Sequence, residues 1–141
     1  MVGEGFRMTD DRLAAAWGPR ALAVLRIVTA LIFIEHGTQK LLGFPPSENP
    51  GPALFSLMGL AGVLELFGGA LVLVGLFTRP VAFVLSGFMA VAYFMAHAPR
   101  SFFPVLNGGD AAILYCFVFL YLCVVGAGAW SVDEARRAGR P

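Results

Sequence analysis

Four long apolar runs constrain the fold of this chain more than any other feature of its sequence. Each holds about the 20 residues that an α-helix needs to cross roughly 30 Å of hydrocarbon. Helices are expected rather than strands because the runs are continuous and because lipid excludes open sheet edges. The sequence therefore predicts an all-α membrane protein, a bundle of four transmembrane helices over about residues 20–42, 54–77, 80–98 and 109–130.

Charged side chains are too scarce for a water-soluble domain of this size. They make up 13% of the 141 residues, whereas hydrophobic residues make up 58%. Soluble globular domains carry roughly 25% charged residues, about twice this supply. The net charge of +1 argues against a nucleic-acid partner. The composition favours an integral membrane protein whose first partner is the lipid bilayer.

The segments outside the runs predict a simple domain organisation. Residues 1–19 hold no long apolar run, so we expect no cleavable signal peptide there. We expect instead a cytoplasmic or interfacial segment, with a short surface helix that Gly18 and Pro19 end. Residues 20–130 should form the transmembrane domain, and residues 131–141 a cytoplasmic tail. Only Thr78 and Arg79 separate the second run from the third, so these two helices should form an antiparallel hairpin.

The basic residues predict the orientation of the bundle. Four crossings put both termini on one side, together with the turn at Arg79, and the other side has Lys40 and Arg100 only. Because basic residues are retained in the cytoplasm, both termini are expected there, in a cytoplasmic (inner) membrane. Trp17 and Trp130 then lie at the same cytoplasmic interface. The arginines on that side are Arg7, Arg12, Arg20, Arg79, Arg136, Arg137 and Arg140.

Ionisable and amide side chains interrupt the apolar runs and indicate a functional site. Such groups are costly at membrane depth, so they usually face a bundle interior or a wet cavity. The helical rise places most of them in the middle and outer half of the bundle, and every run contributes. We therefore predict an outer-facing polar cavity. Its members are Glu35, His36, Gln39, Lys40, Glu65 and His97, with Arg26 and Asp110 as secondary residues.

The residue types suggest separate roles within this cavity. Glu65 and His36 are expected to transfer protons, because carboxylates and imidazoles serve as general acids and bases. On the second helix, Gly62, Glu65 and Gly69 share a face, so Glu65 should point into a helix–helix contact rather than into lipid. The polar part of a substrate is expected to bind to Glu35, Gln39, Lys40 and His97.

The same residues also have structural interpretations, which the sequence leaves open. Glu65 would pair with one of the two histidines in a neutral, hydrogen-bonded pair. Lys40 would extend to the outer headgroups and Arg26 to the cytoplasmic ones. Asp110 would stabilise the start of the fourth helix with its negative charge. A metal site is a further alternative, although no ligand spacing of the known metalloenzyme motifs appears.

Three stretches give the chain a family resemblance. They read LRIVTALIFIEHGTQKLLG, GLAGVLELFGGALVLVGLFTRP and FMAVAYFMAHAP. Together they resemble the DoxX family of small bacterial four-helix membrane proteins, over about residues 20–130. The resemblance implies a four-helix bundle in the cytoplasmic membrane. By position it also implies a functional core of His36, Lys40 and Glu65, with Arg26 and His97 beside it.

The resemblance further implies an association with redox systems, because the family takes its name from a small subunit linked to thiosulfate:quinone oxidoreduction. The leading hypothesis is a redox-associated membrane subunit, linked to quinone or to oxidative stress. It would join a partner oxidoreductase subunit and use quinone as its cofactor. Two alternatives stay open: a non-catalytic scaffold or assembly factor for a partner protein, and a small transporter subunit acting as a homo-oligomer. Whether the chain is itself an enzyme is left open as well.

Overall fold

The structure is a computed structural model that describes the backbone of residues 2–46 and 55–139, and the side chains of residues 12–46 and 55–139. These ranges are mostly helical and contain no strand. Two of the long helices include a π-helical turn. One is formed by α2, η1 and α3 without a break, and the other by α4 and η2. The elements are α1 (Val2–Leu42), α2 (Leu57–Val63), η1 (Leu64–Gly68), α3 (Gly69–Val74), α4 (Thr78–Ala92), η2 (Tyr93–His97), α5 (Pro104–Asn107), α6 (Asp110–Val125) and α7 (Val132–Ala138).

The predicted all-α membrane fold is confirmed by the length and composition of the helices. Three of them are long and apolar enough to cross a membrane: Arg12–Leu42, Leu57–Val74 and Thr78–His97. The fourth apolar helix, α6, has 16 residues, which correspond to about 24 Å of rise. It ends at Val125 rather than near residue 130 as predicted. The physical reason is Gly126, whose φ of +99° takes the chain out of the helix.

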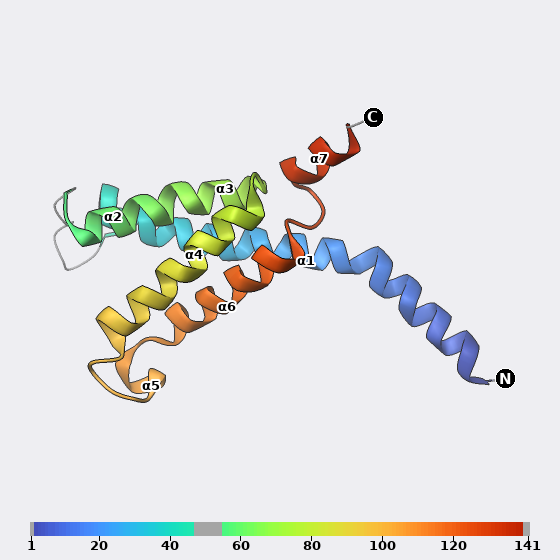
Figure 1. Ribbon diagram of the computed structural model, residues 1–141, viewed down its shortest axis with the longest axis horizontal. Helices are drawn as coiled ribbons and strands as arrows, with labels where there is room; N and C mark the ends of the chain where they lie inside the picture. Colours follow the sequence, from blue (N-terminus) through green and yellow to red (C-terminus); the bar gives the residue numbers. More distant parts are fainter. Residues whose placement is uncertain (1, 47–54, 140–141) are drawn as a thin grey trace.

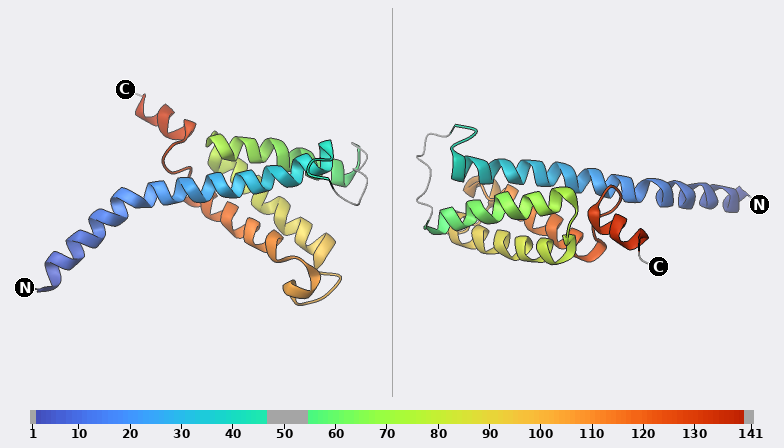
Figure 2. Two further views of the ribbon diagram at one scale, coloured as in Figure 1. Left: turned by 180° about the vertical axis from the view of Figure 1, so that it is seen from behind. Right: turned by 90° about the horizontal axis from the view of Figure 1, so that it is seen from above.

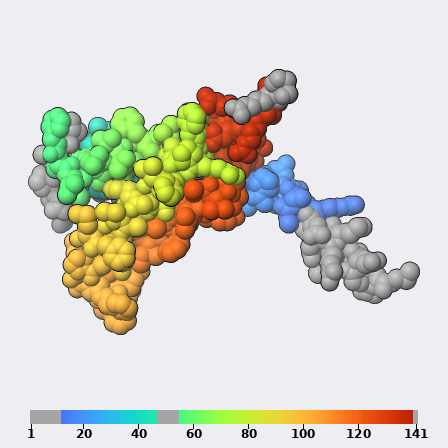
Figure 3. All heavy atoms as spheres, in the orientation of Figure 1, coloured from blue at the N-terminus to red at the C-terminus, as the bar shows by residue number. Residues whose placement is uncertain are grey.

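The helices form two antiparallel pairs (Figure 1). In one pair α1 runs beside the continuous helix α2–η1–α3, and in the other α4 packs along α6. The pairs diverge toward the end of the bundle that carries α5 (Figure 1). We call this the loop end. Both chain termini lie toward the opposite end, the termini end, where α7 and the first turns of α1 project from the bundle (Figure 1). The space-filling view shows α7 at this end (Figure 3).

Two connections differ from their predicted form in detail. The hairpin between the second and third runs is confirmed, but its turn is formed by residues 75–77, with Gly75 and Phe77 at positive φ. The predicted helix break at Gly18 and Pro19 is wrong, because α1 continues through both. A proline inside a helix removes one hydrogen bond and produces a bend, which is visible in the N-terminal half of α1 (Figures 1 and 2).

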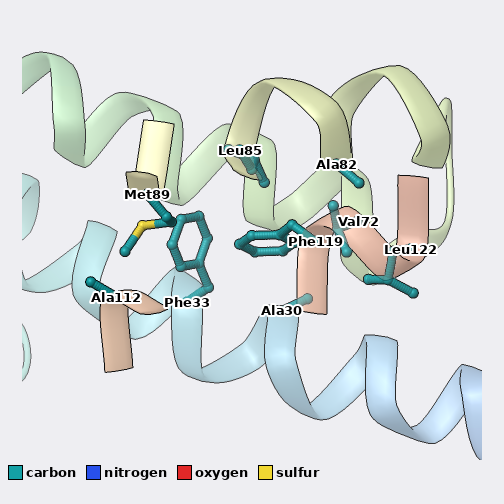
Figure 4. Packing of buried hydrophobic residues seen from close by; sticks show 9 residues of the cluster. All are labelled: Ala30, Phe33, Val72, Ala82, Leu85, Met89, Ala112, Phe119 and Leu122. Carbon is teal, nitrogen blue, oxygen red and sulfur yellow. The ribbon is translucent and has the colours of Figure 1, made fainter. Parts of the chain in front are cut away.

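The apolar core joins the two pairs near the middle of the bundle (Figure 4). The rings of Phe33 and Phe119 meet edge to face with their centroids 4.9 Å apart, so α1 and α6 contact each other through aromatic side chains. Within a bilayer such contacts stabilise the bundle through close packing, because lipid tails are as apolar as the side chains. The buried cluster consists of Ala30, Phe33, Val72, Ala82, Leu85, Met89, Ala112, Phe119 and Leu122.

Glycines allow α1 to approach the second helix closely. A Cβ atom on Gly37 would lie 2.5 Å from the backbone nitrogen of Leu66, and one on Gly62 would lie 2.9 Å from Cγ of Leu41. The first contact is with backbone, which cannot turn aside as a side chain can. The approach of α1 to the start of η1 therefore depends on the absence of a side chain at Gly37.

We expect Gly37→Ala to lower the free energy of unfolding by about 1–3 kcal/mol, the usual cost of forcing atoms into a packed contact. The measurement is an unfolding titration in mixed detergent micelles, followed by circular dichroism. Gly87→Ala is the matched control, because Gly87 is exposed on α4 and a Cβ there meets nothing within 4 Å. Equal stability of the two variants would contradict the proposed role of Gly37.

Candidate functional site

An ion pair between α1 and η1 is the centre of the candidate site. Nζ of Lys40 donates hydrogen bonds to both carboxylate oxygens of Glu65, with Oε2 at 2.6 Å. The Glu65 side chain is 6% exposed and that of Lys40 22%, so the pair is open to its surroundings mainly from the lysine. The structural interpretations that Glu65 pairs with a histidine and that Lys40 extends to the headgroups are therefore wrong. The four-carbon stem of Lys40 reaches inward to the buried carboxylate instead.

A π-helical turn carries Glu65 into this contact. The turn η1 interrupts the regular helix from Leu64 to Gly68, and Glu65 is buried within it. Gly62, Glu65 and Gly69 are all buried, and a Cβ on Gly69 would lie 2.7 Å from Cγ1 of Ile34. The prediction that Glu65 points into a helix–helix contact is confirmed. Single π-helical turns inside α-helices are frequent at functional sites.

His36 and Tyr115 lie next to the ion pair. The two rings meet edge to face with centroids 6.2 Å apart. Tyr115 also stacks on Phe119 and meets Phe33 at a tilt. Glu65 is within electrostatic reach of both His36 and Tyr115. Tyr115 was not among the predicted site residues, which were the acidic, basic and amide side chains of the apolar runs. The sequence did offer a signal for Tyr115, because a hydroxyl group inside a transmembrane run indicates a candidate site residue.

A groove between α1 and α6 leads along Tyr115. Its volume is about 230 Å³, and its surface is almost entirely apolar. The groove is open to the outside of the bundle, so a flat apolar molecule in the membrane can reach the edge of the tyrosine ring. Its lining residues are Thr29, Ile32, Ala111, Leu114, Tyr115 and Val118.

The other predicted cavity residues are not part of this group. Nδ1 of His97 lies 3.1 Å from the carbonyl oxygen of Asn107, and the His97 ring stacks on Tyr93. The amide of Gln39 donates to the carbonyl oxygen of Pro45 over 3.4 Å. Asp110 is exposed as the first residue of α6, where its charge suits the helix N-terminus. Hence His97 and Gln39 form local contacts at the loop end.

Glu35 and His36 differ in position although they are neighbours in sequence. His36 reaches toward α6, as its contact with Tyr115 shows. Glu35 and His36 are both exposed, and the Glu35 carboxylate is within electrostatic reach of Tyr115. The two residues were predicted together as cavity residues, and their side chains point about 100° apart because they are consecutive on an α-helix.

Arg26 has a structural role that the sequence did not reveal. Its side chain is fully buried, and the guanidinium group donates to five carbonyl oxygens. The expectation that Arg26 extends to the cytoplasmic headgroups is wrong. Arginine fits this position because its planar group offers five N–H donors in a fixed arrangement. The acceptors are Val72 and Leu73 in the last turn of α3, and Ala127, Ala129 and Trp130 after α6, with Nε to Ala127 at 2.8 Å and Nη2 to Trp130 at 2.9 Å.

Asp133 of α7 accepts hydrogen bonds from backbone amides at the start of α4, whereas Arg26 donates to carbonyls. Its carboxylate accepts hydrogen bonds from the backbone N–H groups of Phe77 and Thr78 at 2.9 and 2.8 Å. Partial burial by itself would raise the pKa of Asp133, but the hydrogen bonds from Thr78 and Phe77 and the charge of Arg137 outweigh it. The pKa is consequently lowered from its ordinary value of 3.8. The segment after α6 is thereby attached to the hairpin turn.

A wider hollow opens at the termini end, between α1 and α7, with a volume of about 450 Å³. Pro19 and Tyr121 contribute to it from two helices, and Asp133 and Arg137 from α7. None of the predicted site residues lines this hollow. Among the described residues, no group of three or more His, Cys, Asp and Glu side chains is arranged to hold a metal ion.

Comparisons with known proteins identify relatives over nearly the whole chain. A family model described as DoxX matches residues 21–98. A protein of Haemophilus influenzae, named only as uncharacterized, is 48% identical over 121 residues, covering 82% of this chain and 90% of its own. An uncharacterized membrane protein of Mycobacterium tuberculosis is 32% identical, over 87% of this chain and 85% of its own. The inner membrane protein YqjF of Escherichia coli is 27% identical, over 79% and 88%. No solved structure matches.

We expect Arg26→Gln to lower the free energy of unfolding by about 3–5 kcal/mol, because the shorter amide leaves buried carbonyls without donors. The measurement is thermal unfolding of the purified protein in detergent. Arg20→Gln is the matched control on the same helix, since Arg20 is exposed and its guanidinium lies over the Trp17 ring. A loss of stability equal to that of the control would contradict the carbonyl-binding role.

The Asp133 contact predicts a pH dependence. Since the folded pKa is lowered, the contact stabilises the protein above the ordinary value of 3.8 and is lost as the pH falls through the folded pKa. We expect the stability difference between wild type and Asp133→Asn to be largest near about pH 6 and to shrink toward about pH 3. Melting temperatures across this range test it, with Glu134→Gln on the same short helix as control. A difference that is independent of pH would refute the assignment.

Proposed function

Because the chain belongs to the DoxX family of membrane proteins, we propose that it is a redox-associated subunit of the inner membrane that binds a quinol-type headgroup. The Lys40–Glu65 ion pair beside His36 and Tyr115 is the observation that carries this proposal. Relatives named as inner membrane proteins in Escherichia coli support the cellular location. The family alone does not specify the chemistry, and the residues of the site support it instead.

The ion pair and its neighbours suit the two oxygens of a hydroquinone. Oxidation of a hydroquinone releases two protons and two electrons. In the proposed role Glu65 and His36 accept the protons, and the electrons pass to a redox centre of a partner oxidoreductase subunit. The Lys40 ammonium group stabilises the oxygen as its O–H bond breaks, because a positive charge favours the developing anion.

The groove between α1 and α6 provides the proposed entry path. A quinol carries a flat ring on a long apolar tail and therefore resides in the bilayer. The apolar groove of about 230 Å³ opens to the outside of the bundle, and its lining includes Tyr115, whose ring meets the edge of His36. In the proposed pose the ring of the quinol contacts Tyr115 and its oxygens approach Lys40 and Glu65.

We propose the same domain organisation and orientation that the basic residues predict. Residues 1–19 and 131–141 flank a transmembrane domain of residues 20–130, and both termini are cytoplasmic. Two observations support an even number of crossings. Both termini lie toward one end of the bundle, and the Ala129 N–H donates to the Pro19 carbonyl over 3.0 Å, joining the start and the end of the domain. The loop end with the ion pair would then face outward.

A second candidate function is a non-catalytic scaffold or assembly factor. The observation that favours it is that Lys40 and Glu65 already satisfy each other within the chain. In that role the pair only sets how α1 lies against η1, and a partner protein binds elsewhere on the bundle. A small transporter subunit has no comparable observation in its favour.

Binding of a short-chain quinone to the purified protein, followed by thermal shift, tests the proposal. We expect wild type to bind, and Glu65→Gln and His36→Ala to weaken binding about tenfold or more, the loss of roughly one charged hydrogen bond. Asp110→Asn is the control, because Asp110 is exposed at the start of α6. The pair variant Lys40→Met/Glu65→Leu leaves no buried charge unpaired, so it separates lost binding from lost folding. A wild type that binds no quinone, or a pair variant that binds normally, would sink the proposal.

A further inference from the structure

The outward face of α1 has the spacing of a helix–helix interface. Arg26, Ala30, Phe33 and Gly37 are buried on the inner face. On the opposite side, exposed residues are separated by three and four positions in turn, the pattern of a heptad seam. Seen from behind, α1 lies in front of the other helices (Figure 2). We call this the outer seam, and it consists of Leu25, Val28, Ile32, Glu35, Gln39 and Leu42, of which Gln39 is half-buried and the others are exposed.

Glu35 is an unusual residue to find on this face. It lies seven residues before Leu42, the end of α1, and therefore about 10 Å inside the helix end. None of the hydrogen bonds or ion pairs among the described residues involves its carboxylate, and it is not one of the residues with a further partner. A carboxylate that faces lipid tails at this depth is costly, so the face requires a polar cover.

The outer seam fits a second copy of the same chain. In a parallel two-fold pair of helices, any contact from one residue to another is repeated in reverse. A side chain at the Glu35 position of a heptad enters a hole on the facing helix that includes the following residue and the next seam residue. Glu35 therefore meets His36 and Gln39 of the other copy, beside the equivalent Glu35 across the two-fold axis. The seam is complementary to itself, since acid and base are neighbours at the same depth.

We infer that α1 binds a second copy of this chain through the outer seam, forming a parallel dimer in which each Glu35 carboxylate is hydrogen-bonded by His36 of the other copy. Leu25, Val28 and Ile32 provide the apolar packing on the side of the seam nearer the termini. Polar groups that bond across membrane helices favour association. The outer seam shares Ile32 with the groove beside Tyr115, and the dimer contact uses His36 of the proposed site. Cross-linking at Val28, which lies outside both, tests the dimer separately from the proposed function.

Cysteine cross-linking of the full chain in liposomes tests the interface directly. In a variant with Cys116→Ala and Cys123→Ala, we expect Val28→Cys to form a disulfide-linked dimer on mild oxidation, because equivalent seam residues face each other across the two-fold axis. Phe83→Cys is the control, as Phe83 is more exposed than Val28 but lies on α4. Cross-linking through Phe83→Cys alone, or through neither position, would overturn the inference. A product with the mass of a different protein in native membranes would overturn it as well.

Association of fluorescently labelled protein in liposomes, measured by energy transfer on dilution with lipid, tests the role of Glu35. We expect Glu35→Leu to raise the dissociation constant about tenfold, because the carboxyl no longer bonds across the pair. Thermal unfolding of the variant in detergent verifies that it folds. Val124→Leu serves as the matched control on an exposed face of α6. Unchanged association of Glu35→Leu would overturn the Glu35–His36 contact.

Discussion

The structure depends on one constraint: lipid provides no hydrogen-bond partners, so every polar backbone group left free at a helix end must be satisfied by the protein itself. Arg26 meets this requirement where α3 ends and where the chain leaves α6, by donating to five carbonyl oxygens. Asp133 meets it for the first amides of α4. The cost of burying the guanidinium is offset by these bonds. One side chain of α1 thereby joins both helix pairs at the termini end.

The loop end is joined differently, and this difference positions the candidate site. Lys40 and Glu65 join α1 to η1, whereas His97 and Asn107 join the end of the second pair to itself. Neither contact crosses between the pairs, which diverge there (Figure 1). The contact of His36 with Tyr115 links α1 to α6 beside the ion pair. A ligand beside Tyr115 would therefore lie where the two pairs separate.

The sequence anticipated the helices well and the pairing of their polar groups poorly. The apolar runs predicted the four helices because hydrophobic length alone requires them, and the face shared by Gly62, Glu65 and Gly69 was correctly assigned to a helix contact. The helix break at Pro19 was wrong, because a proline can bend a membrane helix without ending it. His97 could not be separated from Glu65 by depth, since depth along a helix does not reveal which neighbouring helix a side chain faces.

The sequence by itself determined that this chain is an all-helical membrane protein of the DoxX family, with polar side chains concentrated toward one end of the bundle. These properties depend on composition, run length and spacing, which are local. Only the tertiary structure decided that Lys40 turns inward to Glu65, that Arg26 binds carbonyls rather than headgroups, and that the ring of His36 contacts Tyr115. The physical reason is that each of these contacts joins residues from different helices. Its geometry depends on how closely the helices pack and on how they are rotated.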